Sequence, residues 1–243
     1  MRKISIAVLS FLFVAGSFTL SSAQTVDEII DTYLETIGGA DAWKKVNSME
    51  FAGKSSMQGM DFPVTVTSAR PNLQKVEINV QGKQIVEAYD GENAWAINPF
   101  MGSMEPQAKT EEESKEAATN MFEDDLIDYK EKGHTLTLEG KEEIEGTECF
   151  KIKMVKADGE EMYHFFDTEL YIPVMTRTFA KMGPMKGQAI ETYVSDYDEV
   201  DGLIVPFSIE QKLGGQTFMQ MTAESVKFNI EVADEFFAMP AGN

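Results

Sequence analysis

The stretch that decides the fold reads Ala-Arg-Pro-Asn-Leu from Ala69 to Leu73 and Tyr-Asp-Gly-Glu-Asn-Ala-Trp-Ala-Ile-Asn-Pro-Phe from Tyr89 to Phe100. Pro71 fixes its own φ and pushes Arg70 towards the extended region. The dipeptide Asp90-Gly91 favours reversal of a hairpin. Between these two turn signals, apolar and polar residues alternate over 73–81, which is typical of a strand with one wet face. We therefore predict an extended run that ends at Arg70, a turn, a strand and a hairpin.

These residues resemble periplasmic lipoprotein carriers of the LolA type. Arg-Pro-Asn-Leu is followed at a similar distance by Asp-Gly-x-x-x-Trp-x-x-Asn-Pro-Phe. The resemblance implies a half-open, strongly curved antiparallel sheet closed by helices, with lipoprotein acyl chains shielded in a cavity between them. It also implies that Arg70 hydrogen-bonds backbone groups of a lid and holds the empty carrier closed, and that Trp95 packs in or beside the cavity. We expect Phe100, Met121 and Phe122 to complete the ligand-binding or lid-latch set.

The rest of the chain reads as strands separated by turn residues at intervals of roughly 8–12 residues, which is typical of a meandering sheet. We expect strands over 47–58, 62–70, 73–81, 84–90, 94–98, 134–139, 147–156, 161–167, 172–180, 187–196, 203–212, 216–222 and 224–231. The predicted fold is mainly β with covering helices: one strongly curved antiparallel sheet, a half-open barrel of about 11–13 strands.

Two helical segments are expected beside the sheet. Thr25 to Glu28 has the form of a capping box, and apolar residues then recur every three or four positions until Gly38-Gly39. This pattern predicts an amphipathic N-terminal helix. Between 107 and 132 the alternation disappears, and acidic residues crowd Glu111 to Glu116 ahead of Met121 and Phe122. We expect one or two helices here, either as a lid over a cavity mouth or as an ordinary cover of the sheet.

The N-terminal end of the chain indicates export. Residues 1–23 combine Arg2-Lys3, a short apolar run and Ser-Ser-Ala, the form of a secretory signal peptide. The remainder, 24–243, is expected to be one domain in the periplasm with no membrane-spanning segment. Its single cysteine, Cys149, lies far from the predicted cleavage site, so we expect no N-terminal lipid.

Charge restricts the class of partner. Removing Arg2 and Lys3 from the 21 basic residues leaves 19 against 41 acidic ones, a net charge of −22. Such a charge argues against nucleic acid and against stable adsorption to anionic lipid surfaces. Most of these charges are explained by solubility alone.

The sequence offers little catalytic or metal-binding machinery. Its only histidines, His134 and His164, follow no Gly-x-Ser-x-Gly elbow, and no His-x-x-x-His or paired cysteine occurs. The acidic run Asp196–Gly202 departs from the EF-hand order and is better explained by a solvated hairpin turn. We expect no catalytic residues, no metal and no cofactor.

Methionine and phenylalanine are the remaining signal. Removal of residues 1–23 would leave 14 of the 15 methionines, and many of them alternate with Phe and Val on predicted strands. Methionine side chains can adapt their packing to flexible ligands. Our first hypothesis is a monomeric, non-catalytic carrier of acylated lipoproteins or another lipid, served by inner- and outer-membrane transfer proteins. The second is a sensor or adaptor domain that binds a protein or lipidated partner, and the third is a small lipid-modifying enzyme. A histidine in a perturbed environment inside a cleft would favour the enzyme.

Overall fold

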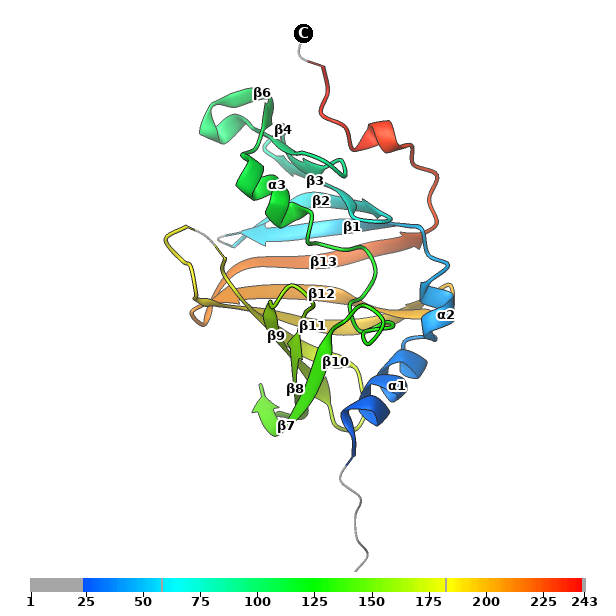
Figure 1. Ribbon diagram of the computed structural model, residues 1–243. Helices are drawn as coiled ribbons and strands as arrows, with labels where there is room; N and C mark the ends of the chain where they lie inside the picture. The colour runs from blue at the N-terminus through cyan, green and yellow to red at the C-terminus, as the bar shows by residue number, and fades with distance from the viewer. Residues whose placement is uncertain (1–23, 58, 182, 242–243) are drawn as a thin grey trace, which may run out of the picture.

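The computed structural model describes residues 24–57, 59–181 and 183–241, so the predicted signal peptide at 1–23 lies outside the described residues. One antiparallel sheet dominates the structure (Figure 1). Its 13 strands follow the order β6-β5-β4-β3-β2-β1-β13-β12-β11-β10-β9-β8-β7. Because β6 and β7 stand at opposite edges, the sheet is not closed. The prediction of a half-open, curved antiparallel sheet is confirmed.

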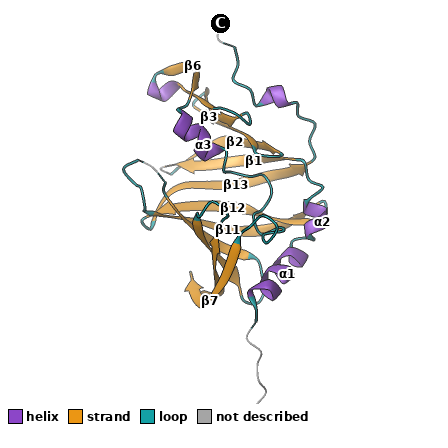
Figure 2. Cartoon of the chain, viewed as in Figure 1, coloured by secondary structure: helices purple, strands orange, loops and turns teal. Residues whose placement is uncertain are grey.

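Figure 2 shows that strands make up most of the chain and that the helices are short. The strands are β1 (Ser48–Met57), β2 (Met60–Ala69), β3 (Leu73–Val80), β4 (Lys83–Tyr89), β5 (Ala94–Asn98), β6 (Ser103–Ala108), β7 (Thr135–Ile144), β8 (Thr147–Val155), β9 (Glu161–Asp167), β10 (Pro173–Phe179), β11 (Ala189–Val200), β12 (Leu203–Leu213) and β13 (Gln216–Phe228). The helices are α1 (Val26–Thr36), α2 (Ala40–Trp43) and α3 (Glu111–Ala117), with short 3₁₀ turns η1 (Pro99–Met101) and η2 (Asp234–Phe236). No helix in this described part of the chain is long and apolar enough to cross a bilayer.

Two meanders make up the sheet. Strands β1 to β6 form one and β7 to β13 the other, and they join where β1 pairs with β13, with Phe51 opposite Val226. A register shift follows Ala52 in this pairing. A Cβ placed on Gly53 would lie 2.0 Å from the carbonyl oxygen of Thr222, so this seam requires glycine at that position.

The register divides the side chains between two faces, because directly opposed residues of antiparallel strands point to the same side. Followed from strand to strand, the pairings place Phe51, Met221, Val194, His164 and Ile152 on one face. We call this the inner face, because α1 packs on it. The shared cluster is formed by Ile29, Ile30, Tyr33, Ile37, Leu126, Leu136, Phe150, Ile152, Met154 and Phe166.

The capping box that begins α1 is confirmed. The Thr25 hydroxyl accepts from the Glu28 N–H, and the Glu28 carboxylate accepts from the Thr25 N–H. These two bonds satisfy backbone donors that the first helical turn leaves free. Ile29, Ile30 and Tyr33 then fall on one side of the helix and are buried against the sheet.

The prediction of one or two helices over 107–132 is confirmed in part, by one short helix. Residues 103–108 form β6, the helix α3 covers only 111–117, and 118–133 is an irregular loop. In this loop the Asp124 carboxylate accepts from the Leu126 N–H, a local bond that competes with helix formation. Elsewhere, the predicted strands 216–222 and 224–231 are one strand, β13, because the chain continues through a bulge. The strand predicted over 187–196 extends to Val200, so only Asp201-Gly202 of the acidic run 196–202 forms the expected hairpin turn.

Candidate ligand-binding site

The irregular segment 118–133, which we call the lid loop, contributes Leu126 to the inner-face cluster. Polar contacts tie it to the surrounding chain at both ends and in the middle. They comprise Glu123–Arg70 (2.8 Å), Asp125–Lys156 (2.5 Å), Asp128–Lys44 (2.5 Å), Lys130–Asp27 (2.7 Å), the Tyr33 hydroxyl donating to Asp124 (2.5 Å) and the Phe122 N–H donating to the Pro71 carbonyl (3.0 Å). Exposed pairs of this kind contribute little individually, but Glu123 and Asp125 are mostly buried and are held more firmly.

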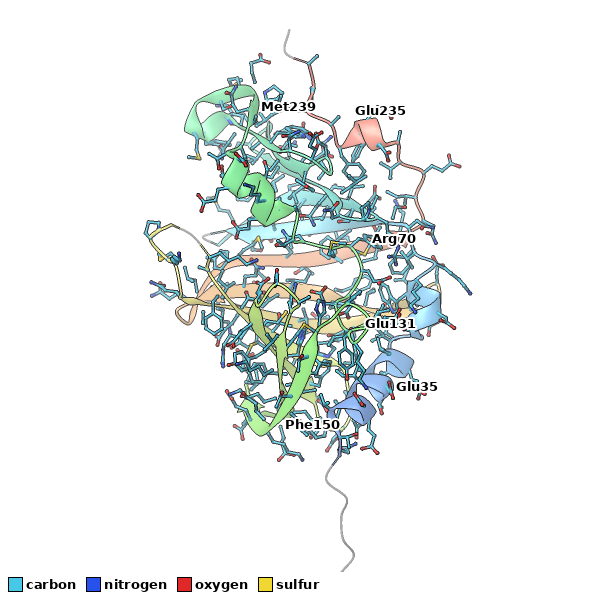
Figure 3. The ribbon with its side chains drawn as sticks, in the orientation of Figure 1. Glu35, Arg70, Glu131, Phe150, Glu235 and Met239 are labelled. Atoms are coloured by element: carbon cyan, nitrogen blue, oxygen red, sulfur yellow. The ribbon has the colours of Figure 1, made fainter. Side chains whose placement is uncertain are left out.

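Arg70 joins the lid loop to the N-terminal helical segment. Its Nε donates to the Val46 carbonyl at 2.7 Å and one Nη to the Trp43 carbonyl at 3.2 Å, while the other Nη binds Glu123. The guanidinium also lies 5.3 Å from the ring centre of Phe122. Figure 3 shows Arg70 on the same side of the molecule as α2. This fork of donors satisfies carbonyls at the end of a short helix, a task suited to arginine.

One part of the expected latch differs. Arg70 reaches the lid loop through the Glu123 carboxylate and not through lid backbone groups. The lid backbone is bound instead by the next two residues of the motif, since the Pro71 carbonyl accepts from Phe122 and the Asn72 side chain donates to the Ala118 carbonyl at 3.1 Å. The whole Arg-Pro-Asn turn therefore holds the loop.

The ion pair changes the titration of Glu123. Burial alone would raise the pKa of this carboxyl, but the hydrogen bonds from Lys132 and Arg70 outweigh burial and lower the pKa below its ordinary value. Glu123 is therefore charged at neutral pH and bridges two cations.

Two pockets flank the segment 121–125. The inner pocket, of about 400 Å³, lies between the lid loop, the helices α1 and α2 and the inner face of β9 to β12. Its apolar wall includes Ile37, Trp43, Val194, Ile204 and Val205. The outer pocket, of about 470 Å³, lies on the Arg70, Lys132 and Lys156 side of the same segment and is lined mainly by polar side chains. The inner pocket is within the size range of sites for small molecules and has the apolar walls they require.

The inner pocket also has a polar wall. Tyr33 donates to Asp124, and burial raises the pKa of both Tyr33 and Tyr197, so these hydroxyls stay protonated. His164 is 5% exposed and stacks on Phe166, and its Nε2 has no partner among the described residues. Burial lowers the pKa of His164, so this imidazole is neutral at neutral pH. A polar wall opposite an apolar one suits an amphipathic ligand.

The apolar surface of the inner face continues beyond this pocket. A second cluster on β1, β2, β12 and β13 is centred on Phe51, Val64, Val205, Ala223 and Val226. Around it lie side chains that stay partly exposed: Met49, Val66, Val76, Ile78, Phe207, Ile209, Met221 and Phe228. This strip provides apolar area that a flexible chain could cover.

The predicted site residues divide into two groups. Met121 and Phe122 line the inner pocket together with Arg70. Trp95 lies on the opposite face of the sheet, which we call the outer face. Trp95 pairs with Ala88, Ala88 pairs with Lys75, and Lys75 pairs with Thr67, so these four side chains point to the same side. The pairing of β1 with β2 places Phe51 on the other side. The Trp95 indole donates to the Phe237 carbonyl under the C-terminal segment, so Trp95 packs away from both pockets.

Phe100 is also distant from the pockets. It lies in η1 at a turn, 52% exposed, with the Lys83 ammonium 5.3 Å from its ring centre. In contrast, the pocket contains Tyr33, Asp124 and Tyr197, none of which the sequence singled out. A signal existed only for Tyr33, which falls on the apolar stripe of α1.

Two further reactive side chains, Cys149 and His134, lie outside the inner pocket. Cys149 is fully buried in an outer-face cluster with Ile144, Phe165 and Met175, and burial raises the pKa of its thiol to about 11. His134 accepts from the Ala157 N–H through Nδ1. Among the described residues, no group of three or more His, Cys, Asp or Glu side chains is arranged to hold a metal ion.

Comparison with known proteins identifies the architecture. No family model and no curated protein matches the chain. A DUF1329 family protein from Desulfovibrio piger has a similar structure at 12% identity and a TM-score of 0.56, covering 89% of this chain and 98% of its own. A LolA superfamily protein from Nitrosomonas europaea gives 12% identity, a TM-score of 0.55 and the same coverage. A domain from Vibrio parahaemolyticus named for outer membrane lipoprotein sorting gives 10% identity and 0.56, covering 84% of this chain and 95% of its own. The chain therefore adopts the fold of the LolA superfamily.

Proposed function

We propose that the protein is an exported, non-catalytic carrier that binds acyl chains of lipoproteins, or another lipid, on the inner face beneath the lid loop. It would act in the periplasm as a monomer and pass its cargo towards the outer membrane. The observation that carries this proposal is the inner pocket, whose apolar wall continues into the partly exposed strip around Phe51 and Val226. An acyl chain can lie along such a strip, and methionines such as Met49 and Met221 can adapt to it.

The lid loop supports the same proposal. It closes the inner pocket through polar contacts to Arg70, Lys156 and Tyr33, whereas Met121 is 52% exposed beside the opening. A loop held by a few polar contacts can open without disrupting the hydrophobic core. Cargo entry would then require release of these contacts and little else.

The direct test is ligand binding. We expect the protein without residues 1–23 to bind a fluorescent long-chain fatty acid saturably, and unlabelled long-chain lipids or a lipopeptide to displace it. Val194→Lys places a charge in the inner pocket and should weaken binding about tenfold or more. Val174→Lys, in the outer-face cluster, is the matched control and should bind as the parent does. No saturable uptake by correctly folded protein, judged by circular dichroism, would remove the carrier proposal and favour an adaptor that binds a protein partner.

One observation favours a second candidate, a small lipid-modifying enzyme. His164 is a buried imidazole with a lowered pKa in the wall of a pocket. Its Nε2 has no nucleophile or carboxylate as partner among the described residues, and so we propose binding and not catalysis. We expect the double variant His134→Gln, His164→Gln to retain ligand binding within about threefold. A stable double variant that loses function in cells but still binds lipid would support the enzyme.

A further inference from the structure

The inner pocket contains a histidine whose hydrogen bonding is incomplete. His164 on β9 is 5% exposed, and its Nε2 has no hydrogen-bond partner in the part of the chain that the structure describes. An unpaired buried polar atom destabilises a folded protein, so such atoms are rare and each requires an explanation. Because His164 lies in the wall of a pocket, a bound ligand can supply the missing partner.

Thr176 on β10 places a second polar group beside His164. The two residues are directly opposed in the pairing of β9 with β10, so their side chains lie next to each other on the inner face. Both line the inner pocket. A neutral imidazole has one donor and one acceptor nitrogen, and a threonine hydroxyl can also donate and accept. The pair can therefore bind a ligand group of either kind.

The other polar groups of this wall have already used their protons. The Tyr33 hydroxyl donates to Asp124 at 2.5 Å, and the Tyr197 hydroxyl donates to the Pro173 carbonyl at 2.8 Å. The second carboxylate oxygen of Asp124 accepts from the Leu126 N–H at 2.9 Å. The lone pairs that remain on these oxygens can only accept. A ligand group that enters here is thus held best if it offers a proton of its own.

The charges of the inner pocket disfavour an ionised ligand group. The charged side chains of its lining are Arg70, Glu123, Asp124 and Asp125, so carboxylates outnumber cations. The only cation among these described residues, Arg70, is bound to Glu123. A carboxylate or phosphate would therefore be repelled. A cationic group would have to displace existing partners, since Glu123 and Asp125 are ion-paired and both oxygens of Asp124 accept hydrogen bonds.

We infer that the inner pocket binds the uncharged, hydroxyl-bearing head group of a long-chain lipid, with His164 Nε2 and the Thr176 hydroxyl as its hydrogen-bond partners. A hydroxyl both donates and accepts, so it can pair with Nε2 in either tautomer of the imidazole. The alkyl chain would then lie along the strip around Phe51 and Val226. The inference rests on the proposed carrier function and adds to it the class of cargo and the direction in which the cargo lies.

The lid loop controls access to this head-group site. Asp124, Leu126 and Ile127 of the loop line the pocket together with His164. The carboxylates of Asp124 and Asp125 also lie close enough to the imidazole to affect its pKa, although burial lowers this pKa more than they raise it. Release of the loop, which cargo entry already requires, would uncover Nε2. The head group would thus bind at the end of the site that the loop covers.

The test compares two ligands with the same alkyl chain, lauryl alcohol and laurate, as competitors of the fluorescent fatty acid at neutral pH. His164→Phe keeps a ring of similar size and removes both ring nitrogens. We expect it to weaken binding of the alcohol about tenfold and binding of laurate less than about threefold. His164→Gln keeps a donor and an acceptor, so it should bind the alcohol within about threefold of the parent. Urea denaturation checks folding, and His164→Phe should be at least as stable as the parent because it removes an unpaired buried atom.

Thr176→Val tests the second partner with a side chain of nearly the same shape. It should weaken binding of the alcohol about threefold and leave binding of laurate unchanged. Thr178→Val lies two residues along the same face of β10, outside the inner pocket, and is the matched control that should change neither affinity. Equal losses for the two ligands, or no loss of alcohol binding in His164→Phe and Thr176→Val, would overturn the inference and leave the carrier proposal intact. Failure of both ligands to bind the folded parent would overturn both.

Discussion

Arg70 binds three oxygen atoms with one guanidinium, two on the α2 segment and one on the lid loop. Hydrogen bonds to charged groups contribute about 1.5–3 kcal/mol each. We expect Arg70→Leu to lower the protection of backbone amides in 118–133 about tenfold or more in hydrogen exchange, with lipid uptake retained. Arg70→Lys should restore only part of this protection, because an ammonium cannot present the same fork of donors.

The matched control for Arg70 is Arg177→Leu. Arg177 is similarly half-buried and pairs with Glu191 at 2.8 Å on the outer face. Its replacement should leave amide exchange in the lid loop unchanged. Unchanged exchange in Arg70→Leu as well would show that Arg70 does not hold the loop.

Glu123 makes closure of the lid loop depend on pH. Its folded-state pKa lies below the ordinary value of 4.5. The contribution of Glu123 is therefore complete above about pH 4.5 and is lost as the pH falls through the lower folded-state pKa. We expect loop amides to keep their protection from neutral pH down to about 4.5 and to lose it, relative to the sheet, as the pH falls further.

Glu123→Gln should show this loss already at neutral pH and should remove its dependence on acid. Glu148→Gln, an exposed carboxylate paired with Lys141, is the control and should leave the loop unchanged. A parent-like acid response in Glu123→Gln would assign the effect to another carboxylate of the loop.

Single residues were predictable where a local motif fixes them. The Arg-Pro-Asn turn specifies the position of Arg70 directly. Trp95 was expected beside the cavity but lies on the outer face, since its side depends on the register of β4 against β5, which no local pattern reveals. Asp124 and Tyr197 reach the pocket only because the lid loop and β11 meet on the inner face.

At the scale of elements, α1 and most strands follow from capping and alternation, whereas the segment after α3 does not. Its Met and Phe residues suggested further helix, but the charged side chains of Glu123, Asp124 and Asp125 bond to partners on other elements. Such long-range contacts override the local preference of these residues for a helix. The same contacts create the pocket, so the pocket was no more predictable than the loop.

The β1–β13 seam supplies the element-scale prediction. Because a Cβ at position 53 would overlap backbone atoms of β13, we expect Gly53→Ala to lower the free energy of unfolding by at least about 3 kcal/mol. Ser55→Ala on the same strand is the control and should cost less than about 1 kcal/mol, since the Ser55 hydroxyl is buried without a partner among the described residues. Urea denaturation measures both. Equal stabilities would mean that the seam relaxes around the added methyl group.

For the whole molecule, the number of strands and their antiparallel order were within reach of the sequence, because short turns between alternating segments leave few other arrangements. The curvature and the gap between β6 and β7 were suggested only by the resemblance. Strand pattern alone does not specify how far a sheet coils, since coiling depends on bulges and on what packs against the inner face.

The pairing of Phe51 with Val226 has a kinetic consequence. Every other strand pair joins strands that are neighbours in the sequence, so each meander can be built from hairpins, and a single hairpin forms within about 1–10 microseconds. Pairing β1 with β13 instead requires closure of a loop that contains most of the domain. High contact order at one contact predicts that seam closure limits the folding rate. We expect Val226→Ala to slow refolding in stopped-flow experiments, and Val86→Ala, within the first meander, to accelerate unfolding instead. Until the seam closes, then, the chain holds two separate half-sheets, and the edges of β1 and β13 stay exposed to pairing with other chains.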